Sequence, residues 1–188
     1  MNPTIKIILL AVLIIVFHNS YSQQTFTPVT SQVGISILSG NMGQCCAWAD
    51  IDNDGDLDLA LSYSYPAIFE IYRNDDGIYT NITNSSGLST IAASSILWAE
   101  ITRDDFTDML TTSNAYKNNG DGTFTTLGQV ASHTSSLADF DKDGNIDILD
   151  IAPPTVKFGN GDGTFGNAYN LPAASIISSV CFDFNNDG

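Results

Sequence analysis

The sequence predicts an all-β fold, a partial β-propeller of four-stranded antiparallel blades with about three complete repeats and the start of a fourth. Acidic loops begin at residues 50, 100, 139 and 183, which gives intervals of 50, 39 and 44 residues. Aliphatic stretches of strand length flank these loops, and an aromatic hairpin motif recurs downstream of the first three. A repeat of this length is typical of a propeller or solenoid array.

The first acidic loop lies in ADIDNDGDLDLAL, residues 49 to 61, where an aspartate occupies every second position. Neighbouring carboxylates repel one another by about 1 kcal/mol per pair even in bulk water, so a cation is expected to neutralise them. Calcium binds to loops that offer side-chain oxygens at positions 1, 3, 5 and 9, a backbone carbonyl at 7 and glycine at 6. A solvated acidic turn is the alternative interpretation. The matching residues are Asp50, Asp52, Asp54, Asp58, Asp56 and Gly55.

Two further loops repeat this pattern. The third loop, in ADFDKDGNIDILDI, offers Asp139, Asp141, Asp143, Gly144, Asn145 and Asp147 at the equivalent positions. The fourth, in FDFNNDG, offers Asp183, Asn185, Asp187 and Gly188 at positions 1, 3, 5 and 6. We therefore predict structural Ca²⁺ in these loops.

The second loop, in WAEITRDDFTDML, keeps the register but departs from the pattern. It has no glycine, and Thr102 replaces the carboxylate at position 3. We expect this loop to bind calcium weakly or not at all. Its remaining acidic residues are Glu100, Asp104, Asp105 and Asp108.

Composition agrees with a packed fold that carries its charge in loops. The 188 residues have a formal net charge of -15 but are 43% hydrophobic, unlike a disordered acidic tail. The four loops hold 15 of the 21 Asp and Glu residues. Six Lys and Arg residues are too few to form a basic surface, so we predict no nucleic-acid partner.

The N-terminus has the layout of a secretory signal peptide. Lys6 precedes an apolar stretch from Ile7 to Phe17, and small residues Ser20 and Ser22 follow. We predict a signal peptide over residues 1 to 22, cleavage after Ser22, and a secreted or cell-surface protein of residues 23 to 188. The apolar stretch is shorter than the ~20 residues of a membrane span, and no transmembrane span is expected in the mature chain.

Residues around the loops favour strands over helices. An EF-hand would need helices and a glutamate at position 12, where the first three loops have Leu61, Thr111 and Asp150. The stretches LDLALSYS and IDILDI are β-branched and aliphatic, with no helical period. Each loop is also preceded by a short apolar stretch. Trp48, Trp98, Leu137 and Cys181 share one phase, two residues before position 1.

A hairpin is predicted downstream of each of the first three loops. The motifs YRNDDGIYTNIT, YKNNGDGTFTTLG and VKFGNGDGTFGNA each place an Asp-Gly pair between two stretches with aromatic residues. Asp-Gly suits tight turns because glycine accepts positive φ. The repeating unit is therefore strand, acidic loop, strand and hairpin, which matches one four-stranded blade.

These paired motifs resemble the FG-GAP or VCBS-type repeat of exported β-propeller proteins, the class that includes the integrin α-subunit propeller. The resemblance covers residues from about Val33 to Gly188. It implies structural calcium between the first two strands of a blade, and a ring that commonly has seven blades. Three repeats and the start of a fourth do not close a ring of four to eight blades, so we expect a fragment that folds poorly alone.

The resemblance implies a module that binds an extracellular protein or glycan in cell adhesion. The alternative is the propeller part of a secreted polysaccharide-degrading enzyme whose active site lies mainly elsewhere. The mature chain has one histidine, His133, and two glutamates, so the sequence predicts no catalytic residue. Tyr63 and Tyr65, beside Pro66, are candidates for stacking on sugars. Cys46 and Cys181 are expected to be buried thiols, and no disulfide is predicted for them or Cys45.

Overall fold

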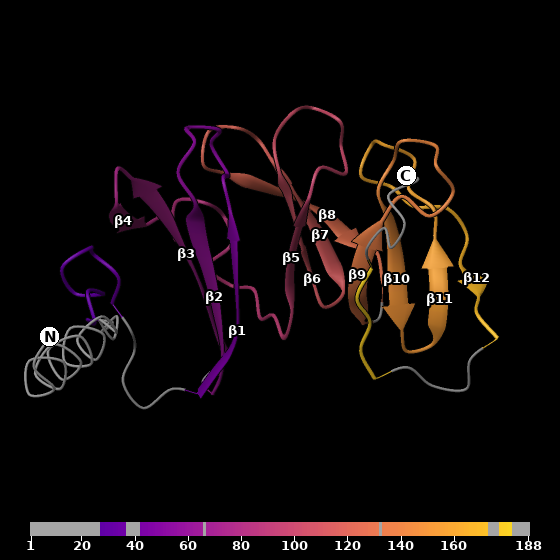
Figure 1. Ribbon diagram of the computed structural model, residues 1–188, viewed down its shortest axis with the longest axis horizontal. Coiled ribbons are helices and arrows are strands. Elements are labelled where there is room, and N and C mark those ends of the chain that lie inside the picture. The colour runs from indigo at the N-terminus through magenta and orange to yellow at the C-terminus, as the bar shows by residue number, and fades with distance from the viewer. Residues whose placement is uncertain (1–26, 37–41, 66, 132, 173–176, 182–188) are drawn as a thin grey trace, which may run out of the picture.

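The computed structural model describes residues 27–36, 42–65, 67–131, 133–172 and 177–181 (Figure 1). Within these ranges the protein is all-β, with three four-stranded antiparallel sheets and no helix. The predicted signal peptide and the residues proposed for the fourth loop, Asp183, Asn185 and Asp187, lie outside them. No described helix is long and apolar enough to cross a membrane.

Each sheet consists of four consecutive strands, so each repeat forms one sheet (Figure 1). This confirms the predicted order of strand, acidic loop, strand and hairpin. No sheet closes on itself, and the three sheets stand in an open row. The first sheet contains β1 (Met42–Ala49), β2 (Asp58–Tyr65), β3 (Ala67–Asp75) and β4 (Ile78–Asn81). The second contains β5 (Ile96–Ala99), β6 (Asp108–Thr111), β7 (Asn114–Asn118) and β8 (Phe124–Gln129). The third contains β9 (Thr134–Ala138), β10 (Asp147–Ile151), β11 (Pro154–Lys157) and β12 (Tyr169–Asn170).

The hairpin turns differ between the sheets. In the first sheet, Asp75 pairs with Ile78, which leaves Asp76 and Gly77 as a two-residue turn. Their φ angles of 54° and 84° are those of a type I′ turn, as the Asp-Gly pair predicts. The other two sheets have longer loops, closed by backbone hydrogen bonds from Asn119 to Thr123 and from Asn160 to Thr164. The inserted Gly-Asp-Gly is therefore accommodated in a wider turn.

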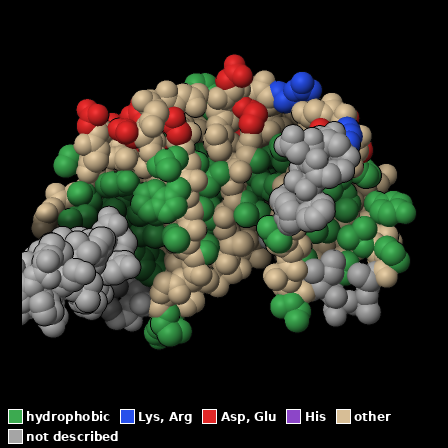
Figure 2. Space-filling model, in the orientation of Figure 1, with side chains coloured by type: hydrophobic (Ala, Val, Ile, Leu, Met, Phe, Trp, Pro, Cys, Tyr) green, Lys and Arg blue, Asp and Glu red, His purple; other side chains and the backbone are tan. Residues whose placement is uncertain are grey.

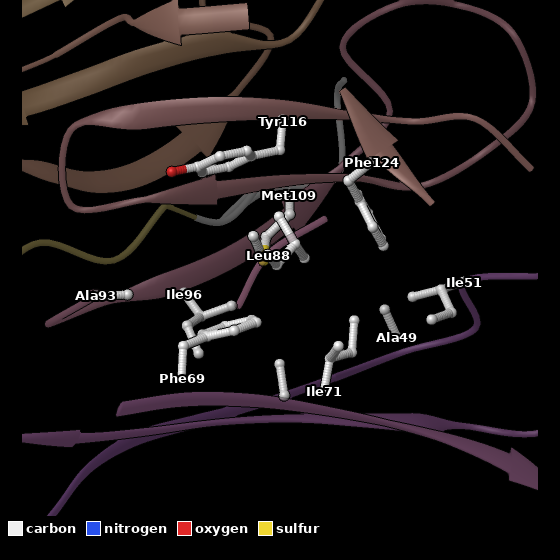
Figure 3. Packing of buried hydrophobic residues seen from close by; sticks show 11 residues of the cluster. Ala49, Ile51, Phe69, Ile71, Leu88, Ala93, Ile96, Met109, Tyr116 and Phe124 are labelled. Atoms are coloured by element: carbon white, nitrogen blue, oxygen red, sulfur yellow. The ribbon is translucent and has the colours of Figure 1, made fainter. Parts of the chain in front are cut away.

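The hydrophobic core lies between the sheets rather than within one of them. Figure 3 shows the cluster between the first two sheets, where Phe69 and Ile71 of β3 face Met109 of β6. A second cluster joins the second and third sheets through Leu110 and Ile148. Because side chains alternate along a strand, the second sheet contributes opposite faces to the two clusters. The sheets thus stack face to face, and the first strands β1, β5 and β9 are neighbours in sequence order.

The expectation of buried thiols is wrong for Cys46, which is exposed on β1, and Cys181 is half-buried. Trp48 shares this phase and is 49% exposed. Both side chains point to the face of the first sheet that has no neighbouring sheet in the described chain. Trp98, the counterpart of Trp48 in the second sheet, packs against the core cluster. Leu59 and Tyr72, in register with Trp48 on the same face, are 5% and 1% exposed, so Cys46 and Trp48 are exposed because they lie on the edge strand β1.

Candidate metal centre

The residue at position 1 organises each acidic loop by accepting backbone hydrogen bonds. Asp50 accepts the N–H groups of Asp54 at 3.1 Å and Gly55 at 3.0 Å. Asp139 accepts those of Asp143 at 3.1 Å and Gly144 at 2.8 Å. The first and third loops therefore have the same geometry. Gly55 and Gly144 adopt φ of 94° and 86°, which explains the need for glycine at position 6.

The aspartate at position 9 is a buried link between the loop and the third strand of its sheet. Asp58 accepts the N–H groups of Ile51 and Asn74, both at 2.7 Å. The same pair of bonds recurs in the other sheets, at distances of 2.7 to 3.0 Å. There Asp108 accepts from Ile101 and Asn118, and Asp147 accepts from Phe140 and Gly159. The sequence pattern proposed a ligand role for Asp58 and Asp147 and missed this structural role of all three aspartates.

Carboxylates converge in the first and third loops. Asp50, Asp52 and Asp58 bring one oxygen each within 4.8 Å of one another, and Asp139, Asp141 and Asp147 do the same. A third group contains Asp52, Asp54 and Asp75. Asp75, in the hairpin, was not predicted, since it lies outside the loop in sequence. In both loops the converging ligands are those at positions 1, 3 and 9.

The other predicted ligands have local roles in the described structure. Asp54 and Asp143, at position 5, each accept the N–H of the residue at position 7, which is Asp56 or Asn145, at 2.8 Å. The side-chain amide of Asn145 also donates to Asp143 at 2.8 Å. The Asp56 carboxylate accepts the N–H of Asp76 at 2.9 Å, which links the loop to the hairpin.

The electrostatics of the first and third loops fit a hard divalent cation. Asp52 Oδ1 is buried and has no hydrogen-bond partner among the described residues. Desolvation and the neighbouring carboxylate of Asp54 raise the pKa of Asp52, and the same two causes, with Asp143 as the neighbour, raise that of Asp141. Burial raises the pKa of Asp58 to about 6, against the hydrogen bonds from Asn74 and Ile51. An all-oxygen set of this kind can hold Ca²⁺ or Mg²⁺.

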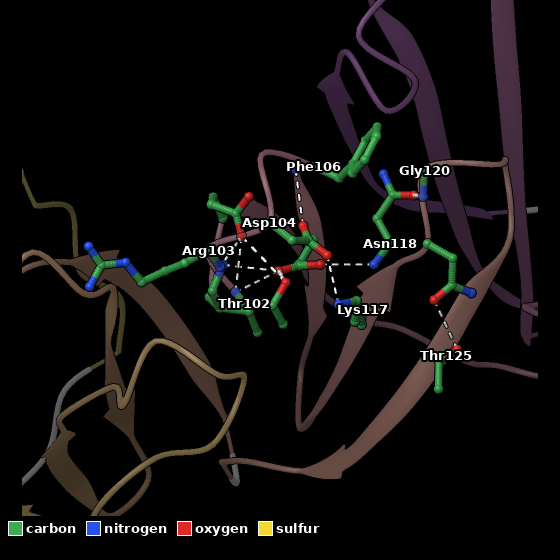
Figure 4. Close-up of polar contacts among 12 residues, drawn as sticks. Thr102, Arg103, Asp104, Phe106, Lys117, Asn118, Gly120 and Thr125 are labelled. Atoms are coloured by element: carbon green, nitrogen blue, oxygen red, sulfur yellow. Dashed lines mark hydrogen bonds and ion pairs between the residues drawn. The ribbon is translucent and has the colours of Figure 1, made fainter.

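The second loop has a protein cation in place of a metal ligand set (Figure 4). Lys117 Nζ lies 2.7 Å from Asp104 Oδ2, and Thr102 Oγ1 donates to Asp108 at 3.0 Å. Desolvation acts to raise the pKa of Asp104, but the hydrogen bonds from Lys117 and from the Phe106 N–H outweigh it, so the pKa is lowered. The described metal-capable groups include no residue of this loop.

The residue that supplies this cation differs between sheets. Lys117 directly precedes Asn118, whose N–H donates to the position-9 aspartate of the second loop. In the first and third sheets the equivalent donors are Asn74 and Gly159, and the residues that precede them are Arg73 and Phe158. Arg73 Nε lies 3.9 Å from Asp52 but 3.2 Å from Asp75. The third sheet has an aromatic ring here and no cation. The sequence could have revealed this difference, since Arg73 and Lys117 follow equivalent tyrosines.

Other predicted site residues lie apart from the loops. Tyr65 is 76% exposed, whereas Tyr63 is buried and donates to Glu70 at 3.3 Å. His133 is exposed, and its N–H donates to Asp150 at 3.0 Å.

No protein-family model matches this chain, and no curated protein matches it.

Proposed function

We propose that this chain is an exported, calcium-stabilised β-propeller module of the FG-GAP or VCBS type that binds a protein or glycan at a cell surface. In this proposal each four-stranded sheet is one blade, and further sheets complete the ring. The stacking of consecutive sheets through their faces supports it, because propeller blades pack in this way. Residues 1 to 22 would direct export to a compartment where calcium is abundant.

One observation carries the calcium part of the proposal. Two loops from different sheets bring carboxylates at positions 1, 3 and 9 together. Figure 2 shows Asp and Glu side chains gathered along the edge of the molecule where these loops lie. Calcium would neutralise this edge and hold the loop between the first two strands of each sheet. The role of the ion is structural.

Thermal unfolding in calcium and in chelator tests the proposal. Extracellular sites of this type bind calcium at about 10⁻⁴ to 10⁻³ M. A tenfold excess over Kd would therefore stabilise the fold by about 1.4 kcal/mol per site. We expect Asp52→Ala and Asp141→Ala each to reduce this stabilisation. Asp162→Ala, a hairpin aspartate outside both groups, should retain it. An unchanged melting temperature with and without calcium would contradict the assignment.

The exposed tyrosine Tyr65 is the candidate for ligand contact. Its ring lies at the end of β2, away from the acidic loops, and can stack on a sugar face. We expect Tyr65→Ala to abolish binding on a glycan array without changing the melting temperature. Tyr169→Ala removes another exposed tyrosine, on β12, and serves as the matched control. Equal loss in both variants, or in neither, would count against a site at Tyr65.

A further inference from the structure

The third sheet departs from the repeat at a position where the other two sheets carry a buried tyrosine. Tyr72 and Tyr116 each pair with the residue that directly follows the position-9 aspartate of their loop. In the third sheet that residue is Ile148, and its partner is Lys157. Tyr72 and Tyr116 are 1% and 8% exposed, whereas Lys157 is half-buried. A lysine side chain thus occupies a place where the repeat otherwise has an aromatic ring.

Lys157 reproduces the polar contact of the tyrosine that it replaces. The hydroxyl of Tyr72 donates to the carbonyl of Ser36 at 3.1 Å, and Lys157 Nζ donates to the carbonyl of Val130. Each carbonyl lies two residues after a glycine of similar conformation, with φ of 92° and 93°. An ammonium group has three donors, so this bond leaves two for another partner.

A cavity of about 260 Å³ lies beside Lys157, between the second and third sheets. Its lining combines apolar and polar side chains, among them those of Leu127, Gln129, Thr164 and Phe165. Val130, which accepts from the ammonium group, also lines the cavity, so this group lies at the cavity wall. Pockets for drug-sized ligands measure about 300 to 1,000 Å³, so this cavity suits a single sugar unit.

Lys157 also differs from the cations of the other two sheets in its ionic contacts. Arg73 Nη2 lies 3.0 Å from Asp75, and Lys117 Nζ lies 2.7 Å from Asp104. No ion pair within the described part of the chain includes Lys157, although acidic residues outnumber Lys and Arg by 21 to 6. A half-buried ammonium group without a carboxylate partner favours an anionic ligand.

We propose that this cavity binds the anionic group, a carboxylate or a sulfate, of an acidic sugar in an extracellular glycan. The two remaining ammonium donors would bind the anion through charge-assisted hydrogen bonds. The side-chain oxygen of Gln129 can accept from a sugar hydroxyl, and Leu127 and Phe165 offer apolar surface to a sugar ring. The inference rests on the proposed glycan binding, names the chemical class of the glycan and adds a contact on a different sheet from Tyr65.

The acidic character of the chain is compatible with this ligand. Exposed charges more than about 8 Å apart are largely screened at physiological ionic strength, so nearby groups matter more than the net charge of -15. Asp162, in the adjoining hairpin, accepts the N–H and the hydroxyl of Thr164 through one carboxylate oxygen. Lys157 supplies the positive charge at the cavity wall.

Calorimetric titration of the full chain in calcium tests the proposal, with an oligogalacturonate, a sulfated oligogalactoside and a neutral oligogalactoside as probes. We expect an acidic probe to bind and Lys157→Tyr to weaken its Kd by about tenfold or more, because the charged hydrogen bonds are lost. This substitution introduces the tyrosine of the other sheets, which can fill the cavity and keep the contact to Val130. Arg73→Gln removes the same charge from the first sheet and should leave the Kd unchanged. Equal Kd values in Lys157→Tyr and the unsubstituted protein, equal losses in both variants, or no binding of either acidic probe would overturn the proposal.

Acetylation of lysine side chains, followed by mass spectrometry, provides a test that needs no substitution. A saturating acidic probe should slow the reaction of Lys157 relative to Lys117 and Lys142 in the same sample, and the neutral probe should not. An unchanged rate at Lys157 would overturn the assignment to this cavity.

The two proposed glycan contacts can fail separately. A protein that binds only neutral glycans, with loss of binding in Tyr65→Ala, contradicts the inference at Lys157 alone. Binding of an acidic probe that is lost in Lys157→Tyr but retained in Tyr65→Ala supports this inference and contradicts the contact at Tyr65.

Discussion

At the scale of single residues, the position-9 aspartate is both a buried acceptor of backbone hydrogen bonds and a candidate metal ligand. Asp58 is 2% exposed and accepts two backbone N–H groups, so its carboxylate holds the loop against β3. The same burial raises its pKa to about 6, from 3.8 in the unfolded chain. Without a cation, ionised Asp58 is therefore less favourable in the folded protein than in the unfolded one. A bound metal would remove this penalty.

The pH dependence of stability follows from this shift. Between pH 3.8 and about 6 the folded state binds more protons at Asp58 than the unfolded state does, so its contribution to stability falls as pH rises through this window. In chelator, we expect Asp58 to favour folding at pH 5 over pH 7, and calcium to stabilise more at pH 7. Melting temperatures at several pH values, with and without calcium, measure both effects. A calcium effect that is larger at pH 5 would contradict the assignment.

At the scale of elements, loops of equal register neutralise their charge in different ways. The first and third loops gather three carboxylates each, whereas the second pairs Asp104 with Lys117. The Lys117 amine is protonated at neutral pH at its ordinary pKa, and the hydrogen bond to Asp104 raises that pKa further. An ammonium group can replace a divalent ion where the loop has lost the glycine and the position-3 carboxylate. We therefore expect metal dependence to differ from loop to loop within the repeat array.

Replacement of Lys117 tests this difference. Lys117→Gln leaves Glu100, Asp104 and Asp108 without a nearby ammonium group, so we expect lower stability in chelator and a larger stabilisation by calcium. Arg73→Gln is the matched control at the same position of the first sheet, where the contact to Asp52 is 3.9 Å. It should change stability less, because Arg73 lies 3.9 Å from its loop carboxylate, whereas Lys117 lies 2.7 Å from Asp104. Chemical denaturation in both conditions measures the effect, and equal responses of the two variants would refute it.

At the scale of the whole molecule, hydrogen bonds between loops connect the stacked sheets. Asn53 Nδ2 donates to the carbonyl of Asp105 at 3.0 Å, and Arg103 donates to Asn145 Oδ1 at 3.1 Å. Asn53 and Arg103 both occupy position 4, with φ of 60° and 56°. The residue after position 3 thus points to the next loop along the row. These contacts add register to the apolar packing, which is not directional.

The buried contact of Asn118 is the strongest test of this register. Asn118→Ala removes the donor to Ile51 and leaves a buried carbonyl unpaired, which costs about 1 to 3 kcal/mol. We expect a loss of stability in this range and weaker protection of the first sheet from amide exchange. Asn119→Ala, an exposed neighbour that binds Thr123, should have a small effect. Equal losses would show that the link between sheets contributes little.

The repeat unit was predictable because it depends on local patterns. Alternating aspartates, Asp-Gly pairs and short aliphatic stretches identify loops, turns and strands without knowledge of distant contacts. These signals led to the all-β assignment and to the four-stranded unit, and the structure confirms both. The two-residue turn at Asp76 and Gly77 follows from the same local chemistry.

The sequence by itself determined where strands, loops and turns lie, and which aspartates share a register. Only the tertiary structure decided the exposure of Cys46 and Trp48, because it depends on which segments pack over the edge strand β1. It also decided that Lys117 enters the second loop and that Asp75 joins a carboxylate group in the first. These contacts join segments from different strands, and no periodic pattern encodes them. Local propensity specifies a repeat unit, whereas packing between units sets the electrostatic environment of each loop.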